Sequence, residues 1–380
     1  MIDVQEEKNI HSANFAQFEK EAAALGPAEV QRTRKGALKR FTELGFPNQR
    51  NEDWRFTNVA PLARIPFKLA AREKSVPSLR DLEDVACPLG SGVRLVFING
   101  HFAPELSLAR KLPAGVVVDS LAVAANSSQL IASIGLGTSV HPDFGSGLWD
   151  GAPIGIPFDV VTKATPRSRV SFLYASESDK GPYPIPKSVH VEGGSDRHAI
   201  LVDRGACRLY ELYDLQRTAS GWQAGSGAIW NLRTNALRPA GWTSADAAGL
   251  PIYPGLARYD ELAHGVIAHA LRFTAPRTRR AYVYPARHYA SSSDDPSLPP
   301  MGLRVRLKAG VDISGFLRQA RIVLQALKTF GMLLADNGSN WYISGAPNPN
   351  WSNDALHSLG RITGSMFDVV DTSSLPQPGQ

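Results

Sequence analysis

A loop rich in glycine, residues 241–250, carries residue types that are well suited to chemistry. It reads GWTSADAAGL and places Trp242 close to Asp246. An aromatic face can stack on a sugar ring, and a carboxylate can accept hydrogen bonds from hydroxyl groups or act as an acid or base. Further along the chain, Asp260 and Glu261 form a pair of carboxylates. We therefore take Asp246, Asp260 and Glu261 as candidate catalytic residues, and Trp242 as a candidate ligand-binding residue.

The next segment is the most basic part of the chain. Its charged residues are Arg272, Arg277, Arg279, Arg280, Arg287 and His288. They could bind an anionic ligand such as a uronate or a phosphate, with Arg272 and Arg287 as ligand-binding residues and His288 as a catalytic candidate. The other interpretation, which we favour, is a solvated edge strand, because charges commonly protect sheet edges.

One further candidate is Asp336, in the run Asp-Asn-Gly-Ser-Asn. Oxygen ligands of this kind could bind Ca²⁺, but the run is too short for an EF-hand loop, so a β-turn is the alternative. His264 and His269 are five residues apart, which does not place two ligands on one helical face. Cys87 and Cys207 have no metal-ligand spacing, and no nucleophile elbow, P-loop or dinucleotide fingerprint is present. We expect no metal site and identify no cofactor.

Composition limits the class of protein. The chain has 380 residues, 43% hydrophobic and 20% charged, so it should fold into a packed globular protein of about two domains. The net charge is +6. The densest basic cluster, between Arg32 and Arg40, fits a solvated helix face better than a nucleic-acid patch, which would interleave aromatics. We expect no membrane span, and the acidic first residues lack a signal sequence, which predicts a cytoplasmic location.

Hydrophobic spacing predicts a mixed first domain, residues 10–135. Residues 13–26 and 28–44 read as two helices joined at a Gly-Pro turn. Trp54 should lie on a short strand or extended segment and anchor the core under this helix pair. Residues 93–98 form a predicted strand closed by the Asn99-Gly100 turn, and residues 120–134 form a helix.

The texture changes near residue 136, where glycine, serine and proline cluster. We place a second, mainly β domain at residues 138–375, with a sandwich-like sheet pair. Its predicted strands are 170–175, 188–192, 199–203, 208–213, 281–284, 303–307 and 332–335, with a hairpin turn at 203–206. One helix, 314–330, has a wide apolar stripe and should be largely buried. The whole fold class is α+β. Trp222, Trp230, Trp341, Tyr342 and Trp351 are interpreted mainly as core residues of this domain.

Two segments of the first domain carry a family resemblance. Residues 45–58 read GFPNQRNEDWRFTN, and residues 94–107 read RLVFINGHFAPELS. Both resemble the N-terminal region of SufD, in the SufB/SufD family of iron–sulfur cluster assembly scaffolds, over about residues 10–130. The resemblance implies SufB-like and SufC-like partner subunits, docking through Trp54 and Arg55, and contact with an iron–sulfur cluster only through those partners.

The second domain has a different resemblance. Residues 203–213, 241–251, 299–302 and 336–339 resemble a family of uncharacterised, mostly exported bacterial proteins rich in β-structure. Two functions therefore stay open. The first is a non-catalytic scaffold or accessory protein of iron–sulfur cluster assembly, located in the cytoplasm. The second is a cell-envelope protein that binds a polysaccharide or hydrolyses a glycan through the second domain, and it would be exported.

Overall fold

The structure is a computed structural model that describes residues 4–22, 28–63, 65–68, 70, 96–103, 106–107, 121–370 and 372. The chain divides into two compact units, residues 1–129 and 130–380. The dividing line falls within helix α5 (Leu121–Ile134), which matches the helix predicted for residues 120–134. The predicted domain limits, 10–135 and 138–375, stay predictions. The presence of both helices and sheets confirms the α+β class.

The first unit begins with two packed helices, α1 (Val4–Ala22) and α2 (Ala28–Leu44). The Lys35 ammonium lies 3.3 Å from Glu19, and the Arg34 guanidinium lies over the ring of Phe18. These contacts confirm the predicted helix pair, although α1 starts nine residues earlier than the predicted start at residue 13. Outside the contact, the basic residues of α2 are largely exposed, which agrees with the predicted solvated face.

The prediction for Trp54 is wrong. The residue ends a short 3₁₀ helix, η1 (Glu52–Trp54), and is 39% exposed. The reason is local: the Asn51 side chain accepts a hydrogen bond from the backbone of Asn48, and the Asn48 side chain accepts one from the backbone of Arg50. Asparagine side chains that bond to nearby backbone in this way favour turns over extended chain.

Short elements complete the first unit. Helix α3 (Ala60–Ala63) follows η1, and strands β1 (Phe97–Ile98) and β2 (His101–Phe102) pair in an antiparallel hairpin. Asn99 and Gly100 have φ values of 49° and 82°, the left-handed conformation that a tight hairpin turn requires. The predicted turn is confirmed, and residues 93–95 of the predicted strand lie outside the described residues.

The second unit is built on three sheets. A six-stranded sheet has the order β19-β16-β17-β15-β18-β3, a four-stranded sheet the order β14-β11-β10-β6, and a three-stranded sheet the order β12-β13-β8. The strands of the first are β19 (Phe367–Val370), β16 (Arg304–Leu307), β17 (Met332–Asn337), β15 (Leu271–Ala275), β18 (Tyr342–Ser344) and β3 (His141–Asp143). Those of the second are β14 (Ser226–Asn231), β11 (Arg208–Tyr213), β10 (Ala199–Asp203) and β6 (Phe158–Val161). Those of the third are β12 (Gln216–Thr218), β13 (Gly221–Ala224) and β8 (Val170–Phe172).

Smaller elements connect these sheets. A short hairpin pairs β4 (Leu148–Trp149) with β5 (Ala152–Pro153). Strand β7 (Arg167–Ser168) pairs antiparallel with β9 (Tyr183–Pro184), and β8 lies between them in the chain. The helices are η3 (Ala175–Glu177), η4 (Tyr253–Gly255), α6 (Tyr259–Ala263), α7 (Arg318–Thr329), α8 (Asn353–His357), η5 (Ser358–Arg361) and η6 (Gly364–Met366). The strands predicted at 188–192 and 281–284 are wrong, because the first is turn and coil and the second makes only an isolated bridge at Tyr282. The strands predicted at 199–203 and 208–213 are present with the same ends, and the other three are present with shifted ends.

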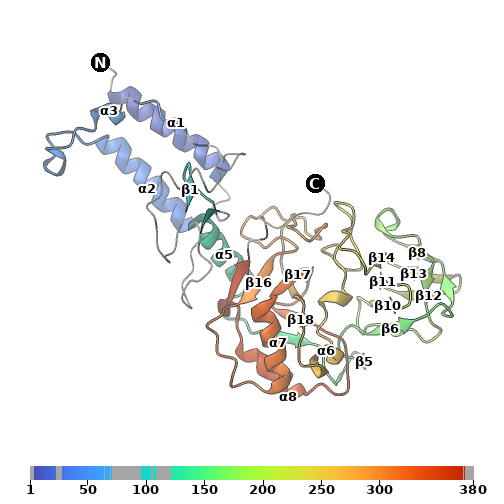
Figure 1. Ribbon diagram of the computed structural model, residues 1–380. Helices are drawn as coiled ribbons and strands as arrows, with labels where there is room; N and C mark the ends of the chain where they lie inside the picture. The colour runs from blue at the N-terminus through green and yellow to red at the C-terminus, as the bar shows by residue number, and fades with distance from the viewer. Residues whose placement is uncertain are drawn as a thin grey trace. The chain divides into compact units, whose positions relative to one another are not determined.

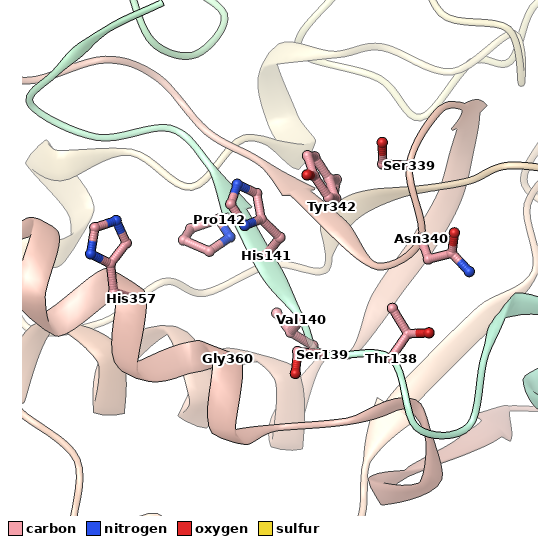
Figure 2. Close-up of a pocket in the computed structure, with 10 residues that line it drawn as sticks. All are labelled: Thr138, Ser139, Val140, His141, Pro142, Ser339, Asn340, Tyr342, His357 and Gly360. Atoms are coloured by element: carbon pink, nitrogen blue, oxygen red, sulfur yellow. The ribbon is translucent and has the colours of Figure 1, made fainter.

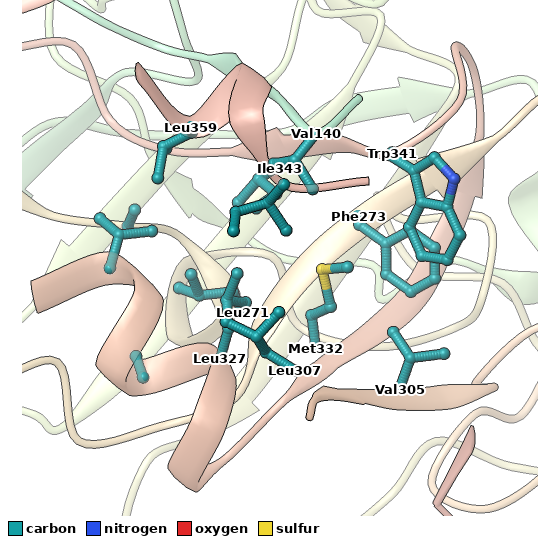
Figure 3. Packing of buried hydrophobic residues seen from close by; sticks show 14 of the residues in the cluster. Val140, Leu271, Phe273, Val305, Leu307, Leu327, Met332, Trp341, Ile343 and Leu359 are labelled. Carbon is teal, nitrogen blue, oxygen red and sulfur yellow. The ribbon is translucent and has the colours of Figure 1, made fainter. Parts of the chain in front are cut away.

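The main core lies between one face of the six-stranded sheet and helix α7, which crosses it (Figure 1). Alternate residues of each strand point to this side, among them Leu271 and Phe273 of β15. Phe273, Trp341 and Phe367 stack at ring-centroid distances of 5.3 and 5.2 Å. Figure 3 shows this packing, with Leu327 of α7 close to Leu271 and Leu307. The predicted burial of the helix is confirmed, since Ala320, Val323, Leu324, Ala326 and Leu327 are all buried.

The four-stranded sheet is buried on both faces. On β10, Ile200 and Val202 belong to one cluster with Ile252 and Leu256, whereas Leu201 belongs to another cluster. That second cluster contains Val170, Ala224 and Phe172 of the three-stranded sheet. The two sheets therefore pack face to face, and this part of the unit is sandwich-like. The Asp203–Ala206 turn between β10 and β11 is confirmed, because the Asp203 side chain accepts a hydrogen bond from the backbone of Ala206 at 2.9 Å.

The turn from α7 into β17 depends on Gly331. Its φ is +74°, and a Cβ atom there would lie 2.3 Å from the carbonyl oxygen of Val305. We expect Gly331→Ala to lower the free energy of unfolding by about 1–3 kcal/mol, because both the backbone conformation and the contact become strained. Denaturant unfolding followed by tryptophan fluorescence measures this, since every tryptophan except Trp54 lies in residues 130–380.

Gly310→Ala is the matched control, because a Cβ atom at Gly310 meets nothing within 4 Å. Equal unfolding midpoints for the two variants would show that the α7–β17 turn tolerates a side chain.

Candidate functional site

The face of the six-stranded sheet opposite the core is polar. Strand β3 pairs in parallel with β18, so that His141 lies opposite Tyr342 and Asp143 lies opposite Ser344. Partner residues of a parallel pair point to the same side of a sheet. Strand β15 adds Arg272 to this side, because its neighbours Leu271 and Phe273 point into the core. Side chains that could take part in chemistry are therefore aligned across three neighbouring strands.

Asp336 joins this polar face through a β-bulge in β17. Before the bulge, Phe273 pairs with Leu334, and after it, Thr274 pairs with Asp336. Ala335 is therefore an extra residue between the two pairs. In a regular strand Asp336 would share the core side with Met332 and Leu334, because side chains alternate. The bulge turns the carboxylate to the side of Arg272 instead, which is a common use of bulges.

Arg272 is the centre of a buried polar cluster. Its Nη1 donates to the Ser344 hydroxyl at 2.6 Å, and its Nη2 donates to Asp246 Oδ1 at 3.0 Å. Asp336 Oδ2 lies 3.8 Å from the same Nη2. Arg272 and Asp246 are buried, whereas the Asp336 side chain is 25% exposed. The structure thus brings together three residues that the sequence predicted separately. It also shows that the edge-strand interpretation is wrong for Arg272, because β15 is a central strand.

The carboxylates of this cluster have altered acidity. Burial raises the pKa of Asp336 to about 7, and the neighbouring Asp246 contributes in the same direction. Burial also raises the pKa of Asp246, although Arg272 opposes the shift. The pKa of Asp143 is raised by burial and by the charge of Glu192. Asp336 and Asp143 are partly exposed, so they are the members that could exchange protons with solvent, and Asp336 would do so near neutral pH.

His198 and Glu192 form a further pair of charged side chains near Arg272. His198 Nδ1 forms a short hydrogen bond with Glu192, and His198 Nε2 lies 3.0 Å from the carbonyl oxygen of Ala245. Burial alone would lower the pKa of His198, but Glu192 raises it to about 9. The imidazole is therefore charged at neutral pH and donates from both nitrogens. Sequence reasoning missed this pair, because Glu192 was placed at the end of a strand that does not form.

Glu211 on β11 is a further buried carboxyl that the sequence did not indicate. Its Oε1 accepts hydrogen bonds from the backbone of Ile252 and Tyr253, both at 2.9 Å, and its Oε2 accepts one from the Trp230 indole at 3.0 Å. Burial raises its pKa to about 7 despite these three donors. These contacts tie the start of η4 to the four-stranded sheet, so Glu211 has a structural role.

The predicted residues of the 241–250 loop and the basic segment lie near one another. His288 Nδ1 is 2.8 Å from the carbonyl oxygen of Ala247, and the Arg287 side chain donates to the carbonyl oxygen of Arg238 at 3.0 Å. The Arg238 guanidinium lies 5.5 Å from the ring centroid of Trp242 and so covers one face of that ring. Trp242 is only partly exposed. The predicted catalytic and ligand-binding roles of these residues stay predictions.

Asp260 and Glu261 lie apart from this group, on the short helix α6. Glu261 makes a short ion pair with Arg258, and its Oε2 lies 3.0 Å from His269 Nε2. Asp260 is exposed and 3.8 Å from the Arg258 side chain. The two carboxylates belong to a local ion-pair network, and the structure does not bring them to Asp246.

Beside the polar face lies a pocket of about 370 Å³. It is lined by residues 138–142, by Ser339, Asn340 and Tyr342, and by His357 and Gly360. Figure 2 shows it between strand β3 and the helical segment that carries His357. The rings of His141 and Tyr342 stack with centroids 4.2 Å apart. None of the pocket residues was singled out as a site from sequence, although Tyr342 was noted as an aromatic in a turn-rich region.

Among the residues that the structure describes, no group of three or more histidine, cysteine, aspartate or glutamate side chains could hold a metal ion. Cys207 is a free thiol, and Cys87 lies outside the described residues. None of the described helices has the length and apolar character needed to span a bilayer.

The Arg272 cluster should contribute strongly to stability. We expect Arg272→Met to lower the free energy of unfolding by about 3–5 kcal/mol, because it leaves the buried Asp246 without its cation. The double variant Arg272→Met, Asp246→Leu should recover much of this loss, because no unpaired charge stays buried. Denaturant unfolding of the single and double variants measures both effects.

The matched control is Arg280→Met. Arg280 pairs with Asp294 at 2.9 Å, but both side chains are more than half exposed, so the change should cost less than about 1 kcal/mol. If Arg272→Met costs no more than Arg280→Met, the cluster does not hold the fold together.

Asp336 should make stability depend on pH. Its pKa is about 7 in the folded chain against an ordinary 3.8, so between these values the folded state keeps a proton that the unfolded state has released. Stability from this group is therefore greatest at low pH and falls as the pH rises towards 7. Relative to the unchanged chain, Asp336→Asn should gain up to about 4 kcal/mol between about pH 4 and about pH 8.

Unfolding free energies measured across this pH range provide the test. Asp150→Asn serves as the control, since Asp150 is exposed and has a φ of 47° that asparagine also tolerates. A difference between Asp336→Asn and the unchanged chain that stays constant with pH would mean that Asp336 titrates as an ordinary carboxyl.

Comparison with known proteins places similarity in the first part of the chain. Residues 6–134 match the family described as the SufBD protein N-terminal region. An iron–sulfur cluster assembly SufBD family protein of Synechocystis sp. is 32% identical over 155 residues, which cover 39% of this chain and 33% of that relative. The chain thus spans about one third of the length of the relative it matches. No solved structure matches the chain. The SufD-like character of the N-terminal part is therefore supported both by the family match and by this relative.

Proposed function

We propose that this protein is a component of iron–sulfur cluster assembly, acting without catalysis as a scaffold or accessory subunit. The observation that carries the proposal is the match of residues 6–134 to the SufBD N-terminal region. The relative from Synechocystis sp., which carries the name of an assembly protein of the same family, supports it. The proposed location is the cytoplasm, where such partners would be met.

The proposed partners are SufB-like and SufC-like subunits. The match to the SufBD N-terminal region supports this choice of partners. The resemblance to SufD implies that a cluster would be held by the partners and reached by this chain only indirectly.

Exposed apolar side chains on the first unit support a docking role. Phe56 is 92% exposed, and Leu44, Trp54, Leu62, Ile65 and Phe67 are also exposed. All lie within residues 44–67, the segment that contains the SufD-like motif. Adjacent exposed apolar residues are typical of surfaces that bind another protein. The Arg55 guanidinium lies 5.5 Å from the ring centroid of Phe56, which adds a charged group to the same surface.

The alternative function, an envelope protein acting on glycans through the 241–250 loop, gains no support from the comparisons. The covered face of Trp242 also reduces the surface on which a sugar could stack. We therefore retain cluster assembly as the proposed function of the chain.

Co-purification tests the proposal. We expect the full chain to retain SufB-like and SufC-like subunits of its own organism. The double variant Trp54→Ala, Phe56→Ala should weaken retention about tenfold or more, because central aromatic residues carry much of the energy of an interface. Arg55→Ala should weaken it less, because a charge at the rim of an interface contributes little.

The matched control is Leu148→Ala, which removes a 75% exposed apolar side chain from the second unit. It should leave retention unchanged. If the full chain does not retain the subunits, the proposed partners are wrong. If the double variant Trp54→Ala, Phe56→Ala retains them as well as the unchanged chain does, the proposed surface is wrong.

A further inference from the structure

The pocket beside strand β3 has the size of a small-molecule site. Its volume of about 370 Å³ lies in the range of clefts that enclose small ligands, of about 300–1,000 Å³. All its lining residues belong to the second unit, and they come from three segments that are far apart in sequence. The segments are fastened together: Val140 donates its backbone N–H to Ile362, and His141 donates to Trp341. The shape of the pocket therefore follows from the fold of the sheet.

The lining of the pocket carries little charge, because none of its residues is an arginine, lysine, aspartate or glutamate. Burial lowers the pKa of His141, and His357 adds to the shift, although Asp143 opposes both. The imidazole of His141 is thus neutral, and a neutral imidazole has one donor and one acceptor nitrogen. A ligand that complements this lining carries no formal charge.

Several polar groups that line the pocket have no hydrogen-bond partner within the protein. In the described parts of the chain, no hydrogen bond engages the ring nitrogens of His141 or His357, or the Tyr342 hydroxyl. The Asn340 side chain donates to the carbonyl oxygen of Ile134, which leaves its own oxygen as an acceptor. Such a mixture of donors and acceptors suits hydroxyl groups, which act as both.

The rings of His141 and Tyr342 stack on each other, so each covers one face of the other, as Arg238 does for Trp242, and the outer face of the stack forms an aromatic shelf. Their centroids are 4.2 Å apart with an angle of 30° between the planes. In Figure 2 the two rings stand next to each other above strand β3, with Ser339 and Asn340 on one side and His357 on the other. Aromatic rings offer an apolar surface whose edges are polar. Together with neutral hydrogen-bonding groups, this surface matches a sugar ring, which has apolar faces and a rim of hydroxyl groups.

Other ligand classes fit less well. An anion would meet no arginine or lysine side chain in the pocket lining. A metal ion would need ligands that converge, but Figure 2 shows the ring of Pro142 between those of His141 and His357. No group of three metal-ligating residues is found in the described chain.

We propose that this pocket is a binding site for a neutral pyranose sugar. The sugar ring lies on the His141–Tyr342 shelf, and its hydroxyl groups bond to Asn340, Ser339 and His357. The site is distinct from the Trp242 loop, and it goes beyond the proposed role in cluster assembly without depending on it.

Saturation-transfer NMR on the full chain tests the site. The probes are the methyl glycosides of glucose, galactose, mannose and N-acetylglucosamine, with galacturonate as a charged comparison. At least one neutral glycoside should receive saturation and galacturonate should not. His357→Ala and Tyr342→Ala should each weaken binding about fivefold or more, which corresponds to losing one hydrogen bond or the shelf.

His357 is exposed, so His357→Ala should fold normally and keeps the test valid if Tyr342→Ala does not fold. The matched control is Tyr289→Ala, which removes one ring of the His288–Tyr289 stack outside the pocket, and it should bind like the unchanged chain. No saturation of any neutral glycoside, stronger binding of galacturonate, or undiminished binding by His357→Ala would each overturn the proposal. Loss of Suf partner binding would have no bearing on this outcome.

Discussion

The arrangement of the second unit centres on the buried guanidinium of Arg272. Arg272 joins strand β15 to Asp246 in the 241–250 loop and to Ser344 on β18, with Asp336 close by. The loop it holds is fastened in turn to both large sheets, because Ser226 of β14 bonds to Ser244 and Ala248 bonds to Ala335 of β17. A buried cation without a partner is strongly unfavourable, so the sheets and the loop must adopt one mutual arrangement to satisfy it.

The same arrangement determines which groups reach solvent. Arg272 and Asp246 neutralise one another in the interior, whereas Asp336 and Asp143 lie towards the surface with raised pKa values. His141 and Tyr342 stand on the same side of the sheet, two residues along from Asp143 and Ser344. Charge therefore decreases along the polar face, from the ion pair of Arg272 and Asp246 in the interior to the groups without formal charge that line the pocket. The two regions are parts of one sheet face.

Much of the fold follows from sequence patterns, because they depend on local periodicity. The predicted ends of strands β10 and β11 agree with the observed ends, and helix α7 lies within the predicted range 314–330. Trp54 was misplaced because asparagine side chains, rather than apolar spacing, set the backbone there. Asp246, Arg272 and Asp336 could each be identified as candidates from the sequence. That their side chains form one cluster could not be predicted. They come from separate elements, and the pairing of β15 with β17 is long-range and interrupted by the bulge. Glu211 gave no motif, since its partners are distant in sequence. Glu192 and His198 are only six residues apart, but they were missed because a strand was predicted where the chain forms a turn and coil.

The extra residue Ala335 gives β17 some freedom in length. With Ala335 present, straightening the bulge would turn the Asp336 carboxylate into the hydrophobic core beneath α7. If the residue between Leu334 and Asp336 were absent, alternation alone would keep the carboxylate on the side of the guanidinium, and no bulge would be needed. Related chains should therefore tolerate the loss of one residue at this point, and an alignment with a one-residue gap there is compatible with the same sheet.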